Sequence, residues 1–184
     1  MWNFNDKDLE LEVGGGSHLN KSGCYHAIIK KIELLTTPNG AKQVKFEFDV
    51  EGNEQTIWHT YSKTDGTEID FKVRHLNHLL YLNKLKDPSK IQVVVGKEIG
   101  VFLKAKLSQD KKFINFDIDG FFHTVTKKTA KEFKEGLEAK TYDKMKKMYE
   151  EEKPLERLHE KSVQQTVEEN KQSIDFIDEE FPFN

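Results

Sequence analysis

Two pairs of side chains in this sequence of 184 residues have the spacing of metal or catalytic sites. Asp117 and Asp119 are two residues apart in a strand-like segment, where carboxylates on one side can hold Mg²⁺ for phosphodiester hydrolysis. His75 and His78 are three residues apart in a helix-like segment and can face the same metal ion. No third histidine ligand and no catalytic lysine motif accompany these pairs. We therefore expect solvated carboxylates and helix-surface histidines.

Cysteine chemistry is restricted to Cys24, the only cysteine in the chain. A single cysteine excludes an internal disulfide and a multi-cysteine zinc site. Cys24 and His26 share one strand face, and we expect them to pack there and not to act in catalysis. The sequence also lacks a Gly-x-x-x-x-Gly-Lys-Ser/Thr loop, a Gly-x-Gly-x-x-Gly motif and a Gly-x-Ser-x-Gly motif. We expect no catalytic residue, cofactor or metal. A metal-dependent nuclease that uses Asp117 and Asp119 is the enzymatic alternative.

Aromatic rings interleaved with lysines in strand-like segments indicate a different chemistry. Exposed rings stack on unpaired bases and lysines neutralise phosphates, so the combination is typical of surfaces that bind single-stranded nucleic acid. A duplex would not need exposed rings, because its paired bases hide their faces. The candidate binding residues are Trp58, Phe102, Phe113, Lys42, Lys45, Lys104, Lys106, Lys111 and Lys112.

Each of these rings has a structural alternative. Trp58 would belong to the core if its strand faced the other way. Phe102 and Phe113 would be buried if a helix from the C-terminal part of the chain packed over them. Phe46 and Phe48 share a strand face with two valines, so we assign these two rings to the core.

Hydrophobic periodicity predicts the elements that carry the candidate residues. Alternation of period two or a β-rich composition predicts strands at 24–35, 44–50, 55–61, 99–107 and 114–122. Helical spacing follows the third strand at Ile69, Val73, Leu76 and Leu80, and Thr67 with Asp70 resembles a capping box. A second helical stripe is predicted within 126–152, at Phe133, Leu137, Met145 and Met148, although Gly136 interrupts it.

Five strands with a helix between the third and fourth predict a mainly β OB-fold, which is a five-stranded Greek-key barrel that binds oligonucleotides or oligosaccharides. A different mixed α+β sheet would contain the same elements. We divide the chain into a flexible leader (1–20), the OB-fold domain (21–124), a charged helical or disordered extension (125–172) and an acidic tail (173–184). Packing on the barrel and self-association are both open roles for the extension.

Charge is distributed unevenly along a chain whose net charge is -3. Residues 20–112 contain 16 basic and 11 acidic side chains, whereas residues 168–184 contain six acids and one lysine. A basic body indicates an anionic ligand, with chance surface charge as the alternative. No apolar run is long enough to span a bilayer and the N-terminus does not resemble a signal peptide, so we expect a soluble intracellular protein without a membrane partner.

The last ten residues combine acids with aromatic side chains, which cannot form a core of their own. They suit docking into a basic-rimmed apolar pocket on a partner, or covering the protein's own cationic groove. The tail residues that carry this prediction are Asp175, Phe176, Asp178, Glu179, Glu180, Phe181, Pro182 and Phe183.

This tail resembles that of bacterial and phage single-stranded DNA-binding proteins, whose tips read Asp-Phe-Asp-Asp-Asp-Ile-Pro-Phe or similar. The body resembles phage-encoded versions at Gly23-Cys24-Tyr25, at Gly96-Lys97-Glu98-Ile99-Gly100-Val101 and at Asp119-Gly120-Phe121-Phe122. The chain departs from the pattern at Asn184, which follows the last phenylalanine, and in the charged stretch 126–160.

The resemblance implies an OB-fold, binding of single-stranded DNA with little sequence preference, and a tail that recruits replication and recombination proteins. It places the protein in the cytoplasm of a bacterial host during phage DNA replication. A single-strand annealing recombination protein and a structural phage protein are further alternatives.

Overall fold

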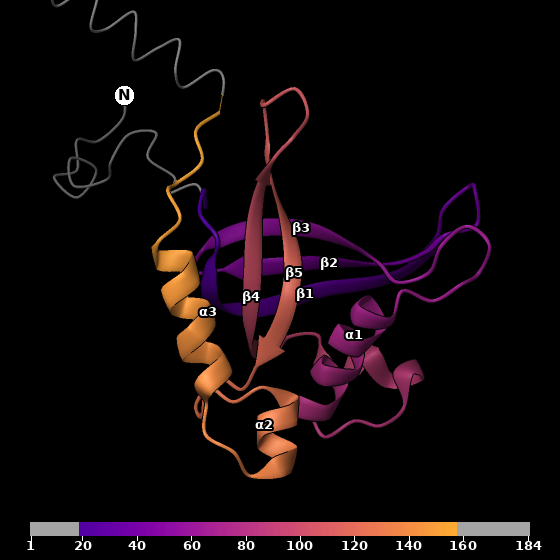
Figure 1. Cartoon of the computed structure of the whole chain (residues 1–184). Coiled ribbons are helices and arrows are strands. Elements are labelled where there is room, and N and C mark those ends of the chain that lie inside the picture. The colour runs from indigo at the N-terminus through magenta and orange to yellow at the C-terminus, as the bar shows by residue number, and fades with distance from the viewer. Residues whose placement is uncertain (1–18, 158–184) are drawn as a thin grey trace, which may run out of the picture.

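The main element of the computed structural model, which describes residues 19–157, is an antiparallel sheet of five strands (Figure 1). The strands are β1 (Gly23–Thr36), β2 (Lys42–Val50), β3 (Asn53–Thr60), β4 (Glu98–Leu107) and β5 (Ile114–Phe122). Their order is β3-β2-β1-β4-β5, and all neighbouring strands are antiparallel. The mainly β architecture is confirmed. The predicted tail residues at 175–183 and nearly all of the predicted leader lie outside the described residues.

The alternation in β2 determines which face of the sheet holds the core. Val44, Phe46, Phe48 and Val50 are all buried, while the residues between them are partly exposed. The rings of Phe46 and Phe48 stack with centroids 5.2 Å apart. The assignment of these two phenylalanines to the core is therefore confirmed.

Strand β1 is long enough to join two parts of the sheet. Its first residues, Gly23–Ile28, pair with β4, and Ala27 to Thr36 pair with β2. A register shift between Ile29 and Lys31 marks a bulge in the β1–β2 ladder. Bulges bend a strand and increase its twist, and the edge strands β3 and β5 also contact each other. The sheet consequently curves around the core.

The connection between β3 and β4 covers one end of the core. It consists of α1 (Asp70–Leu82) and the 3₁₀ helix η2 (Pro88–Val94), which bury Leu79, Leu80, Ile91 and Val94. The helix predicted at this place is thus present. The predicted capping box is wrong, because α1 is preceded by Ile69 without a side-chain cap.

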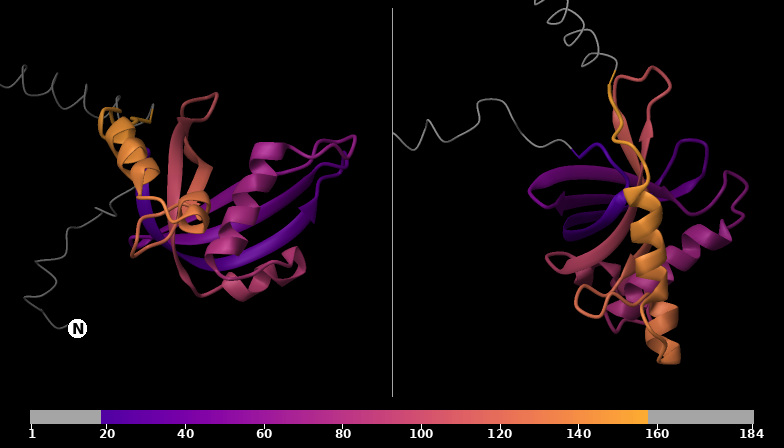
Figure 2. Two further views of the ribbon diagram at one scale, coloured as in Figure 1. Left: turned by 60° about the horizontal axis from the view of Figure 1, so that its bottom comes forward. Right: turned by 60° about the vertical axis from the view of Figure 1, so that its left-hand side comes forward.

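The charged extension contains two helices, α2 (Ala130–Glu135) and α3 (Lys140–Glu150). The single stripe predicted across 126–152 is wrong because Gly136 ends α2 in the left-handed conformation, with φ 66°. A capping box of Thr129 and Glu132 starts α2. Helix α3 lies along the sheet beside β1 and β4 (Figures 1 and 2) and buries Tyr149. Among residues 19–157, no helix has the length and apolar character needed to cross a membrane.

Candidate nucleic-acid interface

Helix α3 covers one half of the sheet surface that faces away from the core and leaves the other half uncovered. We call the part formed by β2, β3 and the end of β1 the open half. The covered half is formed by the start of β1, β4 and β5 beneath α3, where Phe102, Phe122 and Tyr149 form a small second cluster. The predicted binding residues are distributed over the two halves and the turn that joins β4 to β5.

Trp58 is the most prominent side chain of the open half. It lies in β3 opposite Lys45 of β2, and 53% of its surface is exposed. The Lys45 ammonium lies over the indole, 5.5 Å from the ring centroid. The predicted outward orientation of Trp58 is confirmed, and its alternative core position is wrong. An exposed indole of this kind can stack on a base.

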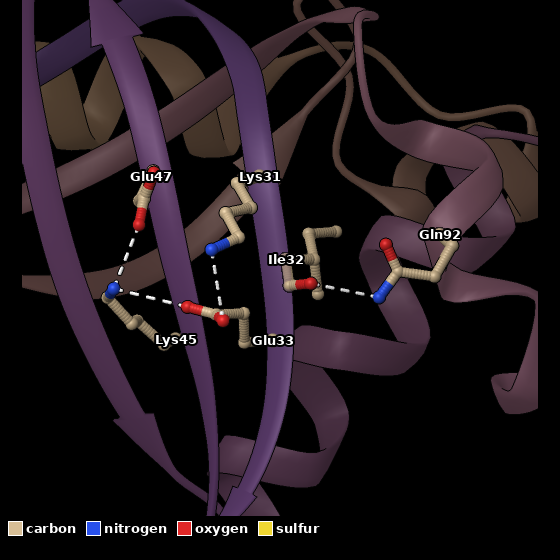
Figure 3. Close-up of polar contacts among 6 residues, drawn as sticks. All are labelled: Lys31, Ile32, Glu33, Lys45, Glu47 and Gln92. Atoms are coloured by element: carbon tan, nitrogen blue, oxygen red, sulfur yellow. Dashed lines mark hydrogen bonds and ion pairs between the residues drawn. The ribbon is translucent and has the colours of Figure 1, made fainter.

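Lys45 is held by carboxylates on both sides (Figure 3). Its Nζ donates to Glu47 Oε1 at 2.8 Å and to Glu33 Oε2 at 3.1 Å, while Lys31 pairs with Glu33 Oε1 at 3.0 Å. Hydrogen bonds to Glu47 and Glu33 raise the pKa of Lys45, and those from Lys31 and Lys45 lower the pKa of Glu33. Lys45 is therefore charged, but it can contact a phosphate only after it leaves the carboxylates of Glu33 and Glu47.

Glu33 and Glu47 also belong to this surface, although neither was predicted as a site residue. Both lie on outward strand positions that alternation identifies. The contact of Glu33 with Lys45 depends on the register Glu33↔Lys45, which alternation does not specify, whereas Glu47 is two residues from Lys45 on the same face of β2. Lys42 starts β2 and is exposed, and it has no ion pair within the described part of the chain.

The β4–β5 hairpin extends beyond the other strands and ends in a turn (Figure 1). We call Lys104–Asp117 the arm, because β4 pairs with β1 only up to Leu103 and continues with β5 alone. At its tip Phe113 is 61% exposed, and Lys111 and Lys112 are exposed beside it. The outward position predicted for Phe113 is confirmed, and packing of this ring under a helix is wrong.

The two remaining lysines of the arm are engaged by acids. Lys106 forms an ion pair with Asp117 on the neighbouring strand. Lys104 pairs with Glu152, just beyond α3, and its Nζ lies 5.9 Å from the Tyr149 ring centroid. Lys104 thus fastens the end of α3 to β4, whereas Lys111 and Lys112 at the tip have no ion pair among residues 19–157.

Phe102 contradicts the prediction of an exposed stacking ring. Its side chain is 2% exposed and lies 4.8 Å from Phe122, measured between ring centroids. Tyr142 and Met145 of α3 pack against the same cluster. Alternation placed Phe102 correctly on the outward face of β4, but α3 covers that part of the face. A base cannot reach the ring while α3 stays in this position.

The two aspartates proposed for a nuclease have different partners. Asp117 pairs with Lys106, and Asp119 Oδ2 accepts a hydrogen bond of 2.7 Å from Tyr149 Oη. Residues 19–157 contain no group of three histidine, cysteine or acidic side chains placed to hold a metal ion. The geometry of the described residues offers no particular support for metal-assisted hydrolysis.

The histidines of α1 are packed rather than fully solvated. His75 lies 5.7 Å from the buried His59, measured between ring centroids, and His59 Nε2 is 2.9 Å from the carbonyl oxygen of Lys72. Burial lowers the pKa of His59 and of His75 to about 4 and also lowers that of His78. The prediction of surface histidines is thus wrong for His75, which is partly buried against His59, and His59 in turn lies edge-on to Phe46 in the core.

No protein-family model matches the chain, and a search of curated proteins finds no significant match.

Proposed function

We propose that the protein binds single-stranded DNA with little sequence preference through the open half and the tip of the arm. The observation that carries the proposal is Trp58, a large ring on the edge strand β3 that is 53% exposed and has a lysine over it. An exposed indole offers its face to an unpaired base, and base stacking is sequence-tolerant because every base has a π face.

The arm supports the same proposal with a second exposed aromatic side chain. Phe113 is exposed at the turn, and Lys111 and Lys112 precede it directly. A ring next to two cations can stack on one base while the lysines neutralise adjacent phosphates. Stacking on Trp58 or Phe113 does not involve hydrogen bonds to base edges, so we expect little sequence preference.

The strand order and curvature are compatible with an OB-fold, and we propose that the domain is one. Three antiparallel strands, a helix and two further strands give the element order of this fold, and OB-folds bind oligonucleotides across the sheet and its loops. Within this proposal the protein resembles phage single-stranded DNA-binding proteins of the bacterial cytoplasm. The acidic tail would recruit replication and recombination proteins.

Fluorescence of Trp58 provides the test, provided that the second tryptophan, Trp2, is removed. In a full-length Trp2→Phe variant, Trp58 is the only indole. Titration with an oligo-dT strand is expected to quench its emission in a saturable and salt-sensitive manner, because a stacked base contacts the ring and phosphates release counterions. Binding by an independent assay without any change in emission would remove Trp58 from the interface. Absence of binding would overturn the proposed function.

A further inference from the structure

An apolar groove with a basic rim lies between the end of α1 and α2. It has a volume of about 260 Å³, and Tyr81, Leu82, Leu85 and Phe133 form its apolar walls. The ring of His123 lies 5.6 Å from that of Phe133, measured between centroids. Phe133 is 48% exposed, so part of a large ring is left uncovered on this surface. A cavity of about 150 Å³ accommodates benzene, so the groove has room for an aromatic side chain.

The charged residues of the groove all have the same sign. Lys84 and Lys86 line it and are exposed, and neither has an ion pair among the described residues. No acidic residue belongs to the described lining. The groove therefore suits a ligand that combines an aromatic ring with negative charge.

The chain itself contains a segment of this chemistry. Residues 175–183 contain four acids together with three phenylalanines, an isoleucine and a proline. A second apolar groove, lined by Leu34, Val44 and Leu76, is a poor match for the same segment, because Glu68 lies on its wall. Charge complementarity thus distinguishes the two grooves.

Chain length allows the segment to reach the groove. The last described residue is Arg157, and 17 residues separate it from Asp175, so at full extension they span roughly 55–60 Å. A domain of this size has a radius of gyration of roughly 14 Å, so every face is within reach. Attachment to the same chain also raises the local concentration to the millimolar range, so that a weak contact is sufficient.

We infer that the C-terminal segment Asp175–Phe183 docks into the groove between α1 and α2, with a phenylalanine against Phe133 and its acids beside Lys84 and Lys86. Helix α2, which contributes Phe133 to the groove, lies at the bottom of the view in Figure 1, whereas the tip of the arm lies at the top. A segment docked there does not contact the cationic tip and leaves the open half accessible. The inference is independent of nucleic-acid binding and holds or fails on its own test.

Backbone amide NMR of the isotope-labelled full chain tests the inference. A Phe181→Ala, Phe183→Ala double variant is expected to shift the amide signals of Leu85, Lys86 and Phe133. The signals of Lys111 to Phe113 are expected to stay unchanged. In the reciprocal experiment, a Lys84→Glu, Lys86→Glu double variant is expected to shift the amide signals of residues 175–183. Both lysines are exposed, and unchanged signals of Ala27 and Ile29 in the core verify that the variant is folded.

A matched control uses the second groove. Leu34→Ala removes an exposed apolar side chain there, and it is expected to leave the signals of residues 175–183 unchanged. Shifts at Lys111 to Phe113 in the tail variant would instead place the segment on the arm and overturn the inference. Shifts that vanish on dilution would assign the groove to the tail of a second copy. The absence of any shift would show that the segment does not occupy the groove. Either of these last two outcomes would also overturn the inference.

Discussion

The two halves of the outer sheet face carry similar aromatic side chains that have opposite environments. Phe102 in the covered half is 2% exposed, whereas Trp58 in the open half is 53% exposed. Both residues point away from the main core, and the difference between them is α3, which places Tyr142, Met145 and Tyr149 over Phe102. An outward-facing aromatic side chain is therefore buried in one half and exposed in the other.

The polar contacts of the two halves differ in the same sense. In the covered half Tyr149 donates to Asp119 and Lys104 pairs with Glu152, so these contacts join α3 to the sheet. In the open half the contacts of Lys45 with Glu33 and Glu47 lie within the sheet and join nothing else to it. Ion pairs on a sheet surface contribute less stability than buried ones and can be exchanged for a ligand.

The largest expected effect separates the halves by stability. Phe102→Ala removes a buried ring and is expected to lower the free energy of unfolding by about 3–5 kcal/mol. Trp58→Ala removes an exposed ring and its contact with Lys45, and a loss below about 1 kcal/mol is expected. Urea denaturation of both full-length variants measures the difference. Similar losses for the two variants would show that the halves do not differ in packing.

The next effect separates the halves by affinity. Trp58→Ala is expected to weaken binding of an oligo-dT strand by about 1–3 kcal/mol, because the ring on which a base stacks is lost. Phe71→Ala is the matched control, since Phe71 on α1 is 54% exposed and also has a lysine nitrogen 5.4 Å from its ring centroid. The control is expected to bind like the unaltered protein. Equal losses for both variants would argue against a specific role for the open half.

Alkaline pH is expected to weaken the covered half. Burial beneath α3 raises the pKa of Cys24 to about 11, so the folded protein keeps a proton that the unfolded chain loses from about pH 8.5. The free energy of unfolding therefore falls as pH rises above that value. With allowance for the partial exposure of the thiol, the loss between pH 8 and 9.5 is about 1 kcal/mol.

Urea denaturation at these two pH values measures the loss, and a Cys24→Ala variant is its control. Without the thiol, the difference in unfolding free energy between pH 8 and 9.5 is expected to be smaller by about the same 1 kcal/mol. An identical pH dependence in both proteins would mean that Cys24 is not protected by α3.

The smallest effect concerns the carboxylates that hold Lys45. Glu47→Gln removes the nearer of the two partners, and affinity for oligo-dT is expected to rise by about 0.5 kcal/mol because Lys45 is freed for a phosphate. Glu54→Gln on β3 removes the same charge, but Glu54 has no ion pair within the described residues. A smaller gain is expected from this control, and equal gains would attribute the effect to net charge alone.

Periodicity predicted the elements well where each strand has one buried face. The valine and phenylalanine alternation of β2 gave its core residues, and helical spacing gave α1. Trp58 and Phe113 were assigned to the surface for the same reason. Alternation identifies the face of a strand but not what covers it, so Phe102 was placed in the interface although α3 packs over it.

Contacts between distant residues could not be predicted in this way. The pairing of Lys45 with Glu33 depends on the β1–β2 register, and that of Lys104 with Glu152 depends on where α3 lies. The break at Gly136 was visible as an unfavourable residue in a helix, but its left-handed conformation and the new start of α3 at Lys140 were not. The capping box was expected before α1 and occurs instead at α2.

The most direct test of the account compares a single strand with a duplex. The unaltered full chain is titrated with an oligo-dT strand and with a duplex of the same length at two salt concentrations. We expect preferential binding of the single strand, because only unpaired bases offer their faces to Trp58 and Phe113, and a lower affinity at higher salt. Equal affinity for the duplex, or the absence of salt-sensitive binding to either ligand, would contradict the account.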